Sequence, residues 1–183
     1  PHSLSSNFVR ACCEDNLGNI WIGTFNGLNR YNKITGLFQN HTANDTQADG
    51  LTHSSIWCIV KDNQGTLWLG TYFGGVNYFN PEYEIYTRYS YSSNEKKGLS
   101  NPVVGRTIED RDGNLWIGTE GGGLNYYNRR TREFKWYRPQ EGRNSISHNN
   151  VKALYYDADK EIIWIGTHLG GLNKLDILSL IHI

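Results

Sequence analysis

The chain has 183 residues, a length typical of one domain. Its 18 basic and 18 acidic residues balance, so no strong field attracts nucleic acid or an anionic membrane, and we expect contact with neither. Aromatic residues make up 13% and there are 20 glycines, a combination that favours short strands and tight turns, while no apolar run approaches the roughly 20 residues of a membrane-spanning helix.

A stretch of tryptophan, isoleucine or leucine, glycine and threonine occurs four times. The four tryptophans are spaced by 47, 48 and 48 residues, at Trp21, Trp68, Trp116 and Trp164. A constant period of this length indicates a repeat protein built from one supersecondary unit. With the Leu or Ile that opens each copy, the period divides a single domain, 1–183, into units at approximately 4–50, 51–98, 99–145 and 146–183.

Each unit is predicted to contain four short strands. The first is an apolar stretch, at 9–13, 56–60, 104–108 and 151–155. The second carries the tryptophan stretch, and the third follows a glycine-rich turn. The fourth is an aromatic segment, at 38–41, 86–91 and 134–138. Turns rich in Asp, Asn and Gly separate the strands, as antiparallel hairpins require.

Four-stranded units at this period are typical of β-propeller blades. We therefore predict an all-β fold of four consecutive four-stranded antiparallel blades. One blade cannot bury both of its faces alone, so each tryptophan is predicted to anchor the packing between adjacent blades. Closed propellers usually have more than four blades, so we expect an arc of a larger ring. The open faces and edges of an arc favour a homo-oligomer.

The last unit departs from the pattern. After Asp176, residues 177–183 replace the expected turn and aromatic strand. This tail is either a truncated outer strand or a non-native end, so we expect the last blade to be incomplete or atypical. The chain also begins at Pro1 without a methionine, and we expect an excised piece of a longer protein.

Three cysteines, Cys12, Cys13 and Cys58, fall in the first predicted strand of their units. Neighbouring residues in a strand point to opposite faces, so a bridge between Cys12 and Cys13 would be strained. We interpret all three as small buried apolar residues. No spaced metal-ligand partners are evident, and neither a metal nor a cofactor is expected.

The repeated pattern resembles the two-component regulator propeller repeat. It consists of Asp, two variable residues, Gly, Asn or Thr, an aliphatic residue, the tryptophan stretch and, after a short turn, Gly-[Leu/Val]-Asn. Three copies carry it in full, at 15–29, 62–77 and 110–125, and the fourth keeps only 164–173. The resemblance covers residues 4 to about 176. The family motif is structural, so it implies no ligand contacts.

In that family, such repeats form the periplasmic sensor region of hybrid two-component histidine kinases of the Bacteroidetes type, which respond to glycan fragments. The resemblance therefore implies a periplasmic, ligand-sensing module of a membrane-bound sensor, with an oligosaccharide as its ligand. It also implies partners outside this chain, namely the remaining blades and downstream signalling domains. This segment itself is not expected to be an enzyme.

Functional residues are expected where the copies diverge, in the loops at one end of the blades. The turn after the second strand and the loop that enters the first strand emerge at the same end. Aromatic side chains there would stack on a pyranose ring, and polar ones would orient it. The predicted ligand-binding residues, each of which could equally be an ordinary loop or packing residue, are Trp57, Tyr72, Phe73, Arg106, Glu120 and His168.

Two other functions stay open at this point. The propeller could be a protein-interaction or dimerisation scaffold without a small ligand, and glycan binding by the domain separates this function from sensing. A fragment of a propeller lyase or glycoside hydrolase is less favoured, because a glycosidase needs two inward carboxylates at a defined separation. The recurrent acids lie in turns at the opposite end, and Glu120 has no evident acidic partner. No catalytic residue is predicted.

Overall fold

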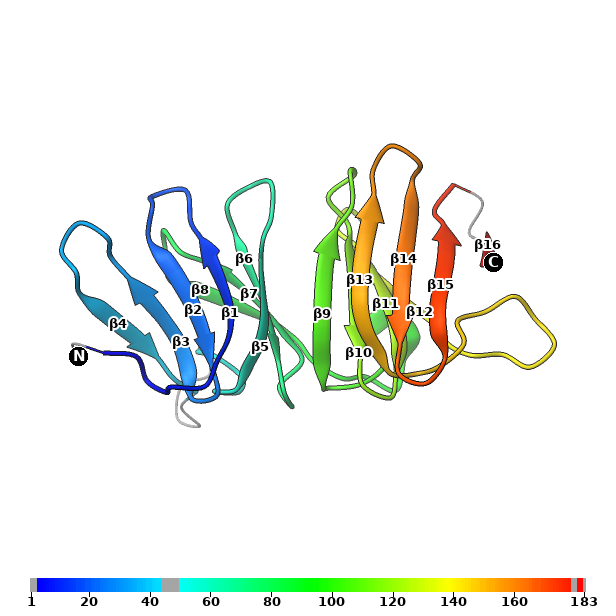
Figure 1. The fold of residues 1–183 in the computed structure, drawn as a ribbon, viewed down its shortest axis with the longest axis horizontal. Coiled ribbons are helices and arrows are strands. Elements are labelled where there is room, and N and C mark those ends of the chain that lie inside the picture. Colours follow the sequence, from blue (N-terminus) through cyan, green and yellow to red (C-terminus); the bar gives the residue numbers. More distant parts are fainter. Residues whose placement is uncertain (1–2, 44–49, 179–180, 183) are drawn as a thin grey trace. The chain divides into compact units, whose positions relative to one another are not determined.

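The computed structural model describes residues 3–43, 50–178 and 181–182, which form four sheets of four antiparallel strands each (Figure 1). The strands of each sheet are consecutive in the chain, so every sheet is a meander. Blade one contains β1 (Val9–Glu14), β2 (Ile20–Thr24), β3 (Gly27–Tyr31) and β4 (Phe38–His41). Blade two contains β5 (Ile56–Lys61), β6 (Leu67–Thr71), β7 (Val76–Asn80) and β8 (Ile85–Tyr89).

Blade three contains β9 (Val104–Glu109), β10 (Leu115–Thr119), β11 (Gly123–Asn128) and β12 (Glu133–Tyr137), and a short 3-10 helix, η1 (Glu95–Lys97), precedes it. Blade four contains β13 (Val151–Asp157), β14 (Ile162–Thr167), β15 (Gly171–Asp176) and β16 (Ile181–His182). The predicted four-stranded antiparallel blades are therefore confirmed. In the described part of the chain, no helix is long and apolar enough to cross a membrane.

The blades group into two compact units. Pro1–Tyr89 holds blades one and two, and Ser90–Ile183 holds blades three and four. The atypical tail supplies the short strand β16, in which Ile181 pairs with Asp176 and His182 pairs with Leu175. Residues 181 and 182 of the tail thus pair as a short outer strand, and residues 179, 180 and 183 lie outside the described residues.

In each unit, the tryptophan side of one blade packs against the other side of the next blade. In the first unit, the ring of Trp21 lies 5.1 Å from that of Phe79, edge to face. The shared core of this unit contains Trp21, Leu28, Leu51, Ile56, Leu67, Leu69 and Phe79. The second unit repeats the arrangement with Trp116, Leu124, Ile146, Val151, Ile163, Ile165 and Leu175. Trp21 and Trp116 thus lie in cores that two adjacent blades share, at the positions where the sequence predicts inter-blade anchors.

The glycine of the tryptophan stretch makes room for the next blade. A Cβ atom on Gly23 would lie 2.7 Å from Cγ2 of Ile56, and one on Gly118 would lie 2.6 Å from Cγ1 of Val151. Real Cβ atoms do not approach carbon so closely, because the van der Waals repulsion is too large. Ile56 and Val151, each from the first strand of the following blade, therefore pack directly on the glycine, which explains why glycine recurs at this position.

In blades one to three, the acidic turn holds the tryptophan by its indole nitrogen. The N–H of Trp21 donates to Asp15 at 2.7 Å, and Asp15 also accepts from the backbone nitrogen of Asn19 at 2.9 Å. The same bond from Trp116 to Asp110 measures 3.0 Å. A buried indole N–H needs an acceptor, and the recurrent aspartate supplies it while closing its own turn. The recurrent acids therefore serve the fold.

The asparagine of the third strand ties each blade to the loop that enters it. Its side-chain oxygen accepts a backbone N–H from that loop, at 2.8 Å from Ser5 to Asn29 and at 2.8 Å from Ser100 to Asn125. Asn29 and Asn125 are fully buried, so these bonds also satisfy polar groups that water cannot reach. The loop and the strand are thereby fixed together at one end of the blade, where the variable residues lie.

The interpretation of the cysteines as buried residues holds only in part. Cys58 is buried and Cys13 is half-buried, but Cys12 is exposed. Cys12 occupies the position of Ile59 in blade two, since Cys12 pairs with Ile22 as Ile59 pairs with Leu69. Blade one has no preceding blade in this chain to cover that side, and the expectation for Cys12 is therefore wrong.

We predict that Trp116→Ala lowers the free energy of unfolding of the second unit by about 3–5 kcal/mol, because it removes a fully buried anchor. Trp164→Ala is the matched control: Trp164 is only half-buried, so its loss is expected to be distinctly smaller. Urea denaturation followed by circular dichroism measures both. A loss below about 1 kcal/mol for Trp116→Ala would contradict the anchor role.

The pKa values of Asp15 and Asp110 are shifted in opposite directions. Burial raises the pKa of Asp15, but hydrogen bonds from Asn19 and Trp21 outweigh burial and hold the pKa below its usual value. For Asp110, burial outweighs the equivalent bonds and raises the pKa. Ionised Asp15 therefore stabilises the fold above its unfolded pKa of about 3.9, and this contribution is lost as pH falls through the lower folded pKa.

We expect the stability difference between the wild type and Asp15→Asn to narrow as pH falls from 5 towards 2. For Asp110→Asn the opposite is expected: as pH falls, the free energy of unfolding of the wild type should rise relative to that of the variant. The reason is that Asp110 binds a proton at a higher pH in the folded chain than in the unfolded chain. Urea titrations at several pH values test both signs. A difference for Asp15→Asn that is constant from pH 7 to pH 2 would disprove the assignment.

Candidate ligand-binding site

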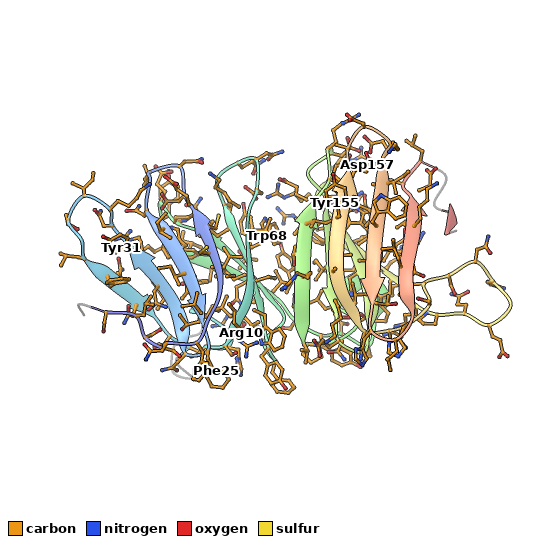
Figure 2. All side chains as sticks on the ribbon, in the orientation of Figure 1. Arg10, Phe25, Tyr31, Trp68, Tyr155 and Asp157 are labelled. Carbon is orange, nitrogen blue, oxygen red and sulfur yellow. The ribbon has the colours of Figure 1, made fainter. Side chains whose placement is uncertain are left out.

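Loops that differ between the copies gather at one end of each blade. In a four-stranded meander, the turn from the second to the third strand lies at the same end as the loop that enters the first strand. In the first unit these are the turns after β2 and β6 and the loop that precedes β5. Arg10 and Phe25, from β1 and the turn after β2, mark this end in Figure 2.

Three of the six predicted ligand-binding residues lie together in the first unit. The rings of Trp57 and Tyr72 stack in parallel, with centroids 5.4 Å apart and an interplanar angle of 9°. Phe73 meets Tyr72 edge to face at 4.3 Å. His53 approaches both, at 6.4 Å from Tyr72 and 6.2 Å from Phe73. These four rings, Trp57, Tyr72, Phe73 and His53, are called the aromatic cluster below.

The aromatic cluster borders a pocket of about 510 Å³. Its lining residues come from both blades of the unit and are Phe25, Ala43, Thr52, His53, Ser54, Ser55, Tyr72 and Phe73. The lining thus combines three aromatic side chains, including the phenol of Tyr72, with the hydroxyl groups of Thr52, Ser54 and Ser55 and the imidazole of His53. A concave surface that combines aromatic side chains with a few polar groups is typical of a small-molecule site.

Trp57 lies beneath Arg10 rather than open to the pocket. The guanidinium carbon of Arg10 is 4.2 Å from the centroid of the indole, a cation–π contact between blade one and blade two. Trp57 stacks on Tyr72 as well, so it supports the tip of the turn after β6. The exposed ring surface belongs to Tyr72 and Phe73, which are 37% and 57% exposed.

Two buried polar atoms beside the pocket lack a hydrogen-bond partner among the described residues. They are the hydroxyl of Ser55, which lines the pocket, and the indole nitrogen of Trp57. A buried polar group without a partner costs free energy, so such groups commonly meet water or a ligand. Their position agrees with a site that accepts hydrogen-bonding groups.

His53 presents a defined donor. Its Nδ1 accepts the backbone N–H of Ser55 at 3.0 Å, so the neutral ring carries its proton on Nε2. Blade four repeats this geometry, because Nδ1 of His148 accepts the N–H of Asn150 at 3.0 Å. Sequence reasoning missed His53; the signal was available, since His53 and His148 both stand two residues after the Leu or Ile that opens their units.

The other three predicted residues, Arg106, Glu120 and His168, lie in the second unit. Glu120 forms a salt bridge with Lys152, and the ring of His168 is 6.3 Å from that of His148. Arg106 donates to the carbonyl of Gly105 at 3.0 Å. Among the described residues, no hydrogen bond, ion pair or ring contact joins these three side chains to one another. Each stays a predicted ligand residue.

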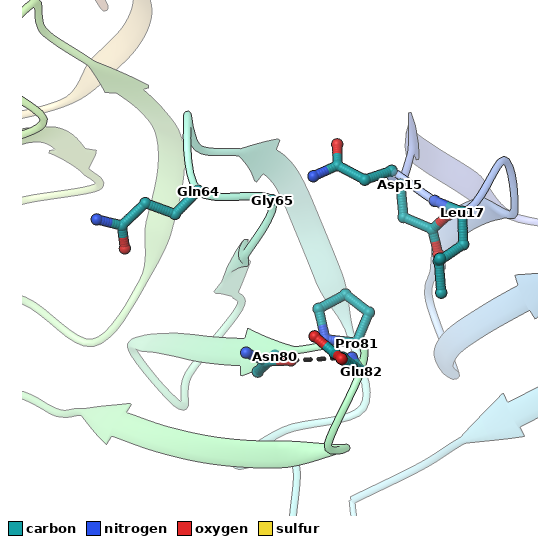
Figure 3. A pocket seen from close by; sticks show the side chains of 8 residues that line it. Asp15, Leu17, Gln64, Gly65, Asn80, Pro81 and Glu82 are labelled. Carbon is teal, nitrogen blue, oxygen red and sulfur yellow. Dashed lines mark hydrogen bonds between the residues drawn. The ribbon is translucent and has the colours of Figure 1, made fainter.

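A second pocket, of about 270 Å³, lies at the opposite end of the first unit (Figure 3). It is lined by Asp15, Asn16, Leu17, Gln64, Gly65, Asn80, Pro81 and Glu82. The carboxylate of Asp15 is already engaged by Trp21 and Asn19, and Asn80 caps its own turn by accepting the N–H of Glu82 at 2.9 Å. Within the described ranges, no group of three His, Cys, Asp or Glu side chains could hold a metal.

The four meander sheets, and the packing of one blade on the tryptophan and glycine of the blade before it, define this molecule as a set of β-propeller blades. The model of the two component regulator propeller family matches residues 3–26, 50–73, 98–121 and 145–168. These segments make up more than half of the chain and include every tryptophan stretch. The chain therefore belongs to the two component regulator propeller family.

Solved structures share the fold at low identity. The extracellular domain of a hybrid two component system from B. thetaiotaomicron matches with a TM-score of 0.87 and 21% identity, over 98% of this chain and 25% of that one. PorZ, a surface component of the type-IX secretion system of Porphyromonas gingivalis, matches with a TM-score of 0.67 and 19% identity, over 98% and 28%.

Virginiamycin B lyase from Staphylococcus aureus matches with a TM-score of 0.57 and 13% identity, over 93% of this chain and 56% of that chain. No curated protein sequence matches the chain. The present chain spans about a quarter of the length of the B. thetaiotaomicron domain. At these identities the three likenesses establish the propeller fold and carry no activity from one protein to another.

We predict that Tyr72→Ala costs at most about 1.5 kcal/mol of stability, because the ring is partly exposed and contributes mainly aromatic stacking. Leu67→Ala in the adjacent strand, where the side chain is fully buried, should cost about 2–5 kcal/mol and serves as the comparison. Urea denaturation measures both. A loss for Tyr72→Ala as large as that for Leu67→Ala would mean that Tyr72 is a core residue.

Proposed function

We propose that this chain is part of the ligand-sensing, extracytoplasmic region of a membrane-bound two-component sensor, and that its ligand is a glycan or oligosaccharide. Membership of the regulator propeller family supports the sensor role. The observation that carries the ligand assignment is the pocket of the first unit, where Tyr72 and Phe73 present exposed ring surface beside His53.

The pocket offers both kinds of contact that a sugar requires. The C–H face of a pyranose ring stacks on an aromatic ring, and Tyr72 or Phe73 would receive it. Sugar hydroxyls need fixed donors and acceptors, and the Nε2–H of His53 and the hydroxyl of Ser55 would supply them. The pocket volume of about 510 Å³ lies in the range of small-molecule sites, so the pocket has room for a sugar unit.

Ligand binding at this place would act on two blades at once. Phe25 comes from blade one, whereas His53 and Tyr72 come from blade two, and all three line the same pocket. A ligand that touches both would favour one arrangement of the two blades over others, which is the requirement for a population shift. In the proposed sensor, the remaining blades on the periplasmic side would transmit that shift to the downstream signalling domains.

A protein-interaction scaffold is the second candidate function. It is favoured by the exposed apolar side chains Leu172 and Tyr155 on blade four. A lyase or hydrolase fragment has less support, because the carboxylate of Glu120 is neutralised by Lys152 and no second carboxylate joins it among the described contacts. A family described as a regulator also gives no reason to expect catalysis.

Isothermal titration calorimetry with a panel of neutral and acidic oligosaccharides tests the sensor proposal. We expect saturable binding of at least one glycan, weakened about tenfold or more in Tyr72→Ala, which corresponds to the ~1.4 kcal/mol of one stacking contact. Phe73→Ala should weaken the same glycan. Arg106→Ala, Glu120→Ala and His168→Ala, titrated in parallel, test the second-unit residues.

The matched control is Leu169→Ala. Leu169 stands in the turn after β14 at the position that Phe73 occupies after β6, and it is 89% exposed. It should leave the affinity unchanged. If the folded protein binds no glycan of the panel, the glycan-sensor proposal fails and the scaffold function takes its place. If a glycan binds but Tyr72→Ala and Phe73→Ala bind it as tightly as the wild type, the pocket of the first unit is not its site.

A further inference from the structure

Blade one places an imidazole where blades two and three place a phenol. His41 ends β4, the outer strand of blade one (Figure 1), and pairs with the residue that follows the turn glycine of β3. Tyr89 in blade two and Tyr137 in blade three have the same pairing. The ring at this position lies 5.6 Å from the tryptophan ring of its own blade in blade one, and 5.7 Å from it in blades two and three. The three side chains therefore occupy one equivalent position of the repeat.

His41 lies in the layer where blade one packs on blade two. Besides Trp21 of its own blade, its ring meets Phe79 of blade two edge to face, with centroids 5.8 Å apart. Trp21 and Phe79 are both fully buried. His41 is half-buried as a whole, but its Nε2 atom is buried and has no hydrogen-bond partner within the described part of the chain. The inner edge of the imidazole thus faces apolar surroundings.

A phenol and an imidazole respond to this burial in opposite ways. Burial raises the pKa of Tyr137 to about 12, so its side chain stays neutral throughout the acidic and neutral range. An imidazole is charged when it is protonated, and burial therefore lowers the pKa of His41 below its usual value of 6.5. Histidine at this position brings into the layer the side chain whose charge ordinarily changes near neutral pH.

The charged neighbours of His41 largely offset one another. Arg30 of β3 lowers the pKa of His41 and Glu84, in the turn before β8, raises it. These two side chains form a salt bridge of 3.7 Å. The strands β2, β4 and β7 carry no Asp, Glu, Lys or Arg, and Arg88 of β8 donates to a backbone carbonyl. Tyr86 of β8 is neutral, because burial raises its pKa. Burial therefore determines the behaviour of His41.

We propose that His41 makes the contact between blades one and two sensitive to acid. Neutral His41 packs between Trp21 and Phe79. A protonated imidazole there would place a poorly compensated charge in an apolar layer, so protonation favours states in which the two blades have separated and water reaches the ring. The second unit has Tyr137 at the equivalent position and lacks this response.

The direction of the response follows from proton linkage. Because the pKa of folded His41 is lowered, the opened chain binds the proton first as pH falls. The stabilising effect of neutral His41 is complete above the ordinary pKa of 6.5 and is lost as pH falls from there to the folded pKa. One proton sets an upper limit of about tenfold per pH unit on the rise of the opening constant.

Opening of this contact would also reach the pocket beside the aromatic cluster. Phe25 of blade one and Tyr72 of blade two line that pocket together, so its shape depends on how these two blades pack. Acid would therefore disturb the pocket without titrating any residue that lines it other than His53. The acid-sensitive contact itself depends only on blade packing and exists with or without a ligand.

Proton–carbon NMR of the imidazole groups, assigned through the backbone of the wild-type chain, is the first measurement. We expect His41 to titrate below 6.5 in the folded chain. A pKa at or above 6.5 would overturn the proposal. It would mean that attraction between the imidazolium and the faces of Trp21 and Phe79 outweighs the cost of burial. This titration needs no variant, so it decides the matter even if the variants below fold poorly.

Hydrogen exchange followed by mass spectrometry tests where the opening occurs. The ratio of the exchange rate of the wild type to that of His41→Phe, taken at one pH, removes the intrinsic pH dependence of exchange. We expect this ratio to grow by up to about tenfold between pH 7.5 and pH 5.5 in peptides that cover β4 and β8. Peptides of blades three and four should show no such growth. A ratio in β4 and β8 that is the same at both pH values contradicts the proposal.

Tyr137→His is the matched test in the second unit, because it places an imidazole at the position equivalent to that of His41. Exchange in peptides of β12, relative to the wild type, should grow as pH falls through the same range. His41→Tyr, which gives blade one the residue of the other two blades, should remove the growth from β4 and β8. A folded Tyr137→His chain without any acid response would show that the position does not confer acid sensitivity, and the explanation for His41 would fall with it.

Discussion

The tryptophan indole of blade one, like that of blade three, carries two obligations at once. Its ring fills the layer between two blades, as Trp21 does against Phe79, and its N–H must find an acceptor in that same dry layer. Asp15 meets the second obligation from the turn that joins the first two strands. The tryptophan, the aspartate and the glycine that admits the next blade therefore form one device, and losing any of the three would disturb the other two.

This device explains why the chain repeats itself so strictly in some positions and so loosely in others. Residues of the tryptophan stretch, the acidic turn and the Gly-[Leu/Val]-Asn segment are held by the packing of a neighbouring blade or by a buried hydrogen bond. The turn after the second strand is closed by a buried bond from the threonine hydroxyl, but the side chains at its tip, such as Phe25 and Phe73, are exposed and free to vary. Tyr72 and Phe73 stand in that turn, beside a pocket, while the equivalent residues of blade four are His168 and Leu169.

The sequence by itself determined the number of copies, the four strands of each blade and the anchoring tryptophans, because a fixed period with alternating apolar positions leaves few ways to bury the apolar side chains. It also selected Trp57, Tyr72 and Phe73, which the structure brings together. Only the tertiary structure decided that Arg10 lies over Trp57, that His53 completes the aromatic cluster, and that Cys12 is exposed. The contact of Arg10 with Trp57 and the exposure of Cys12 depend on which blade faces meet, and the place of His53 depends on how its loop folds against the turn after β6; the period of the repeat carries neither kind of information.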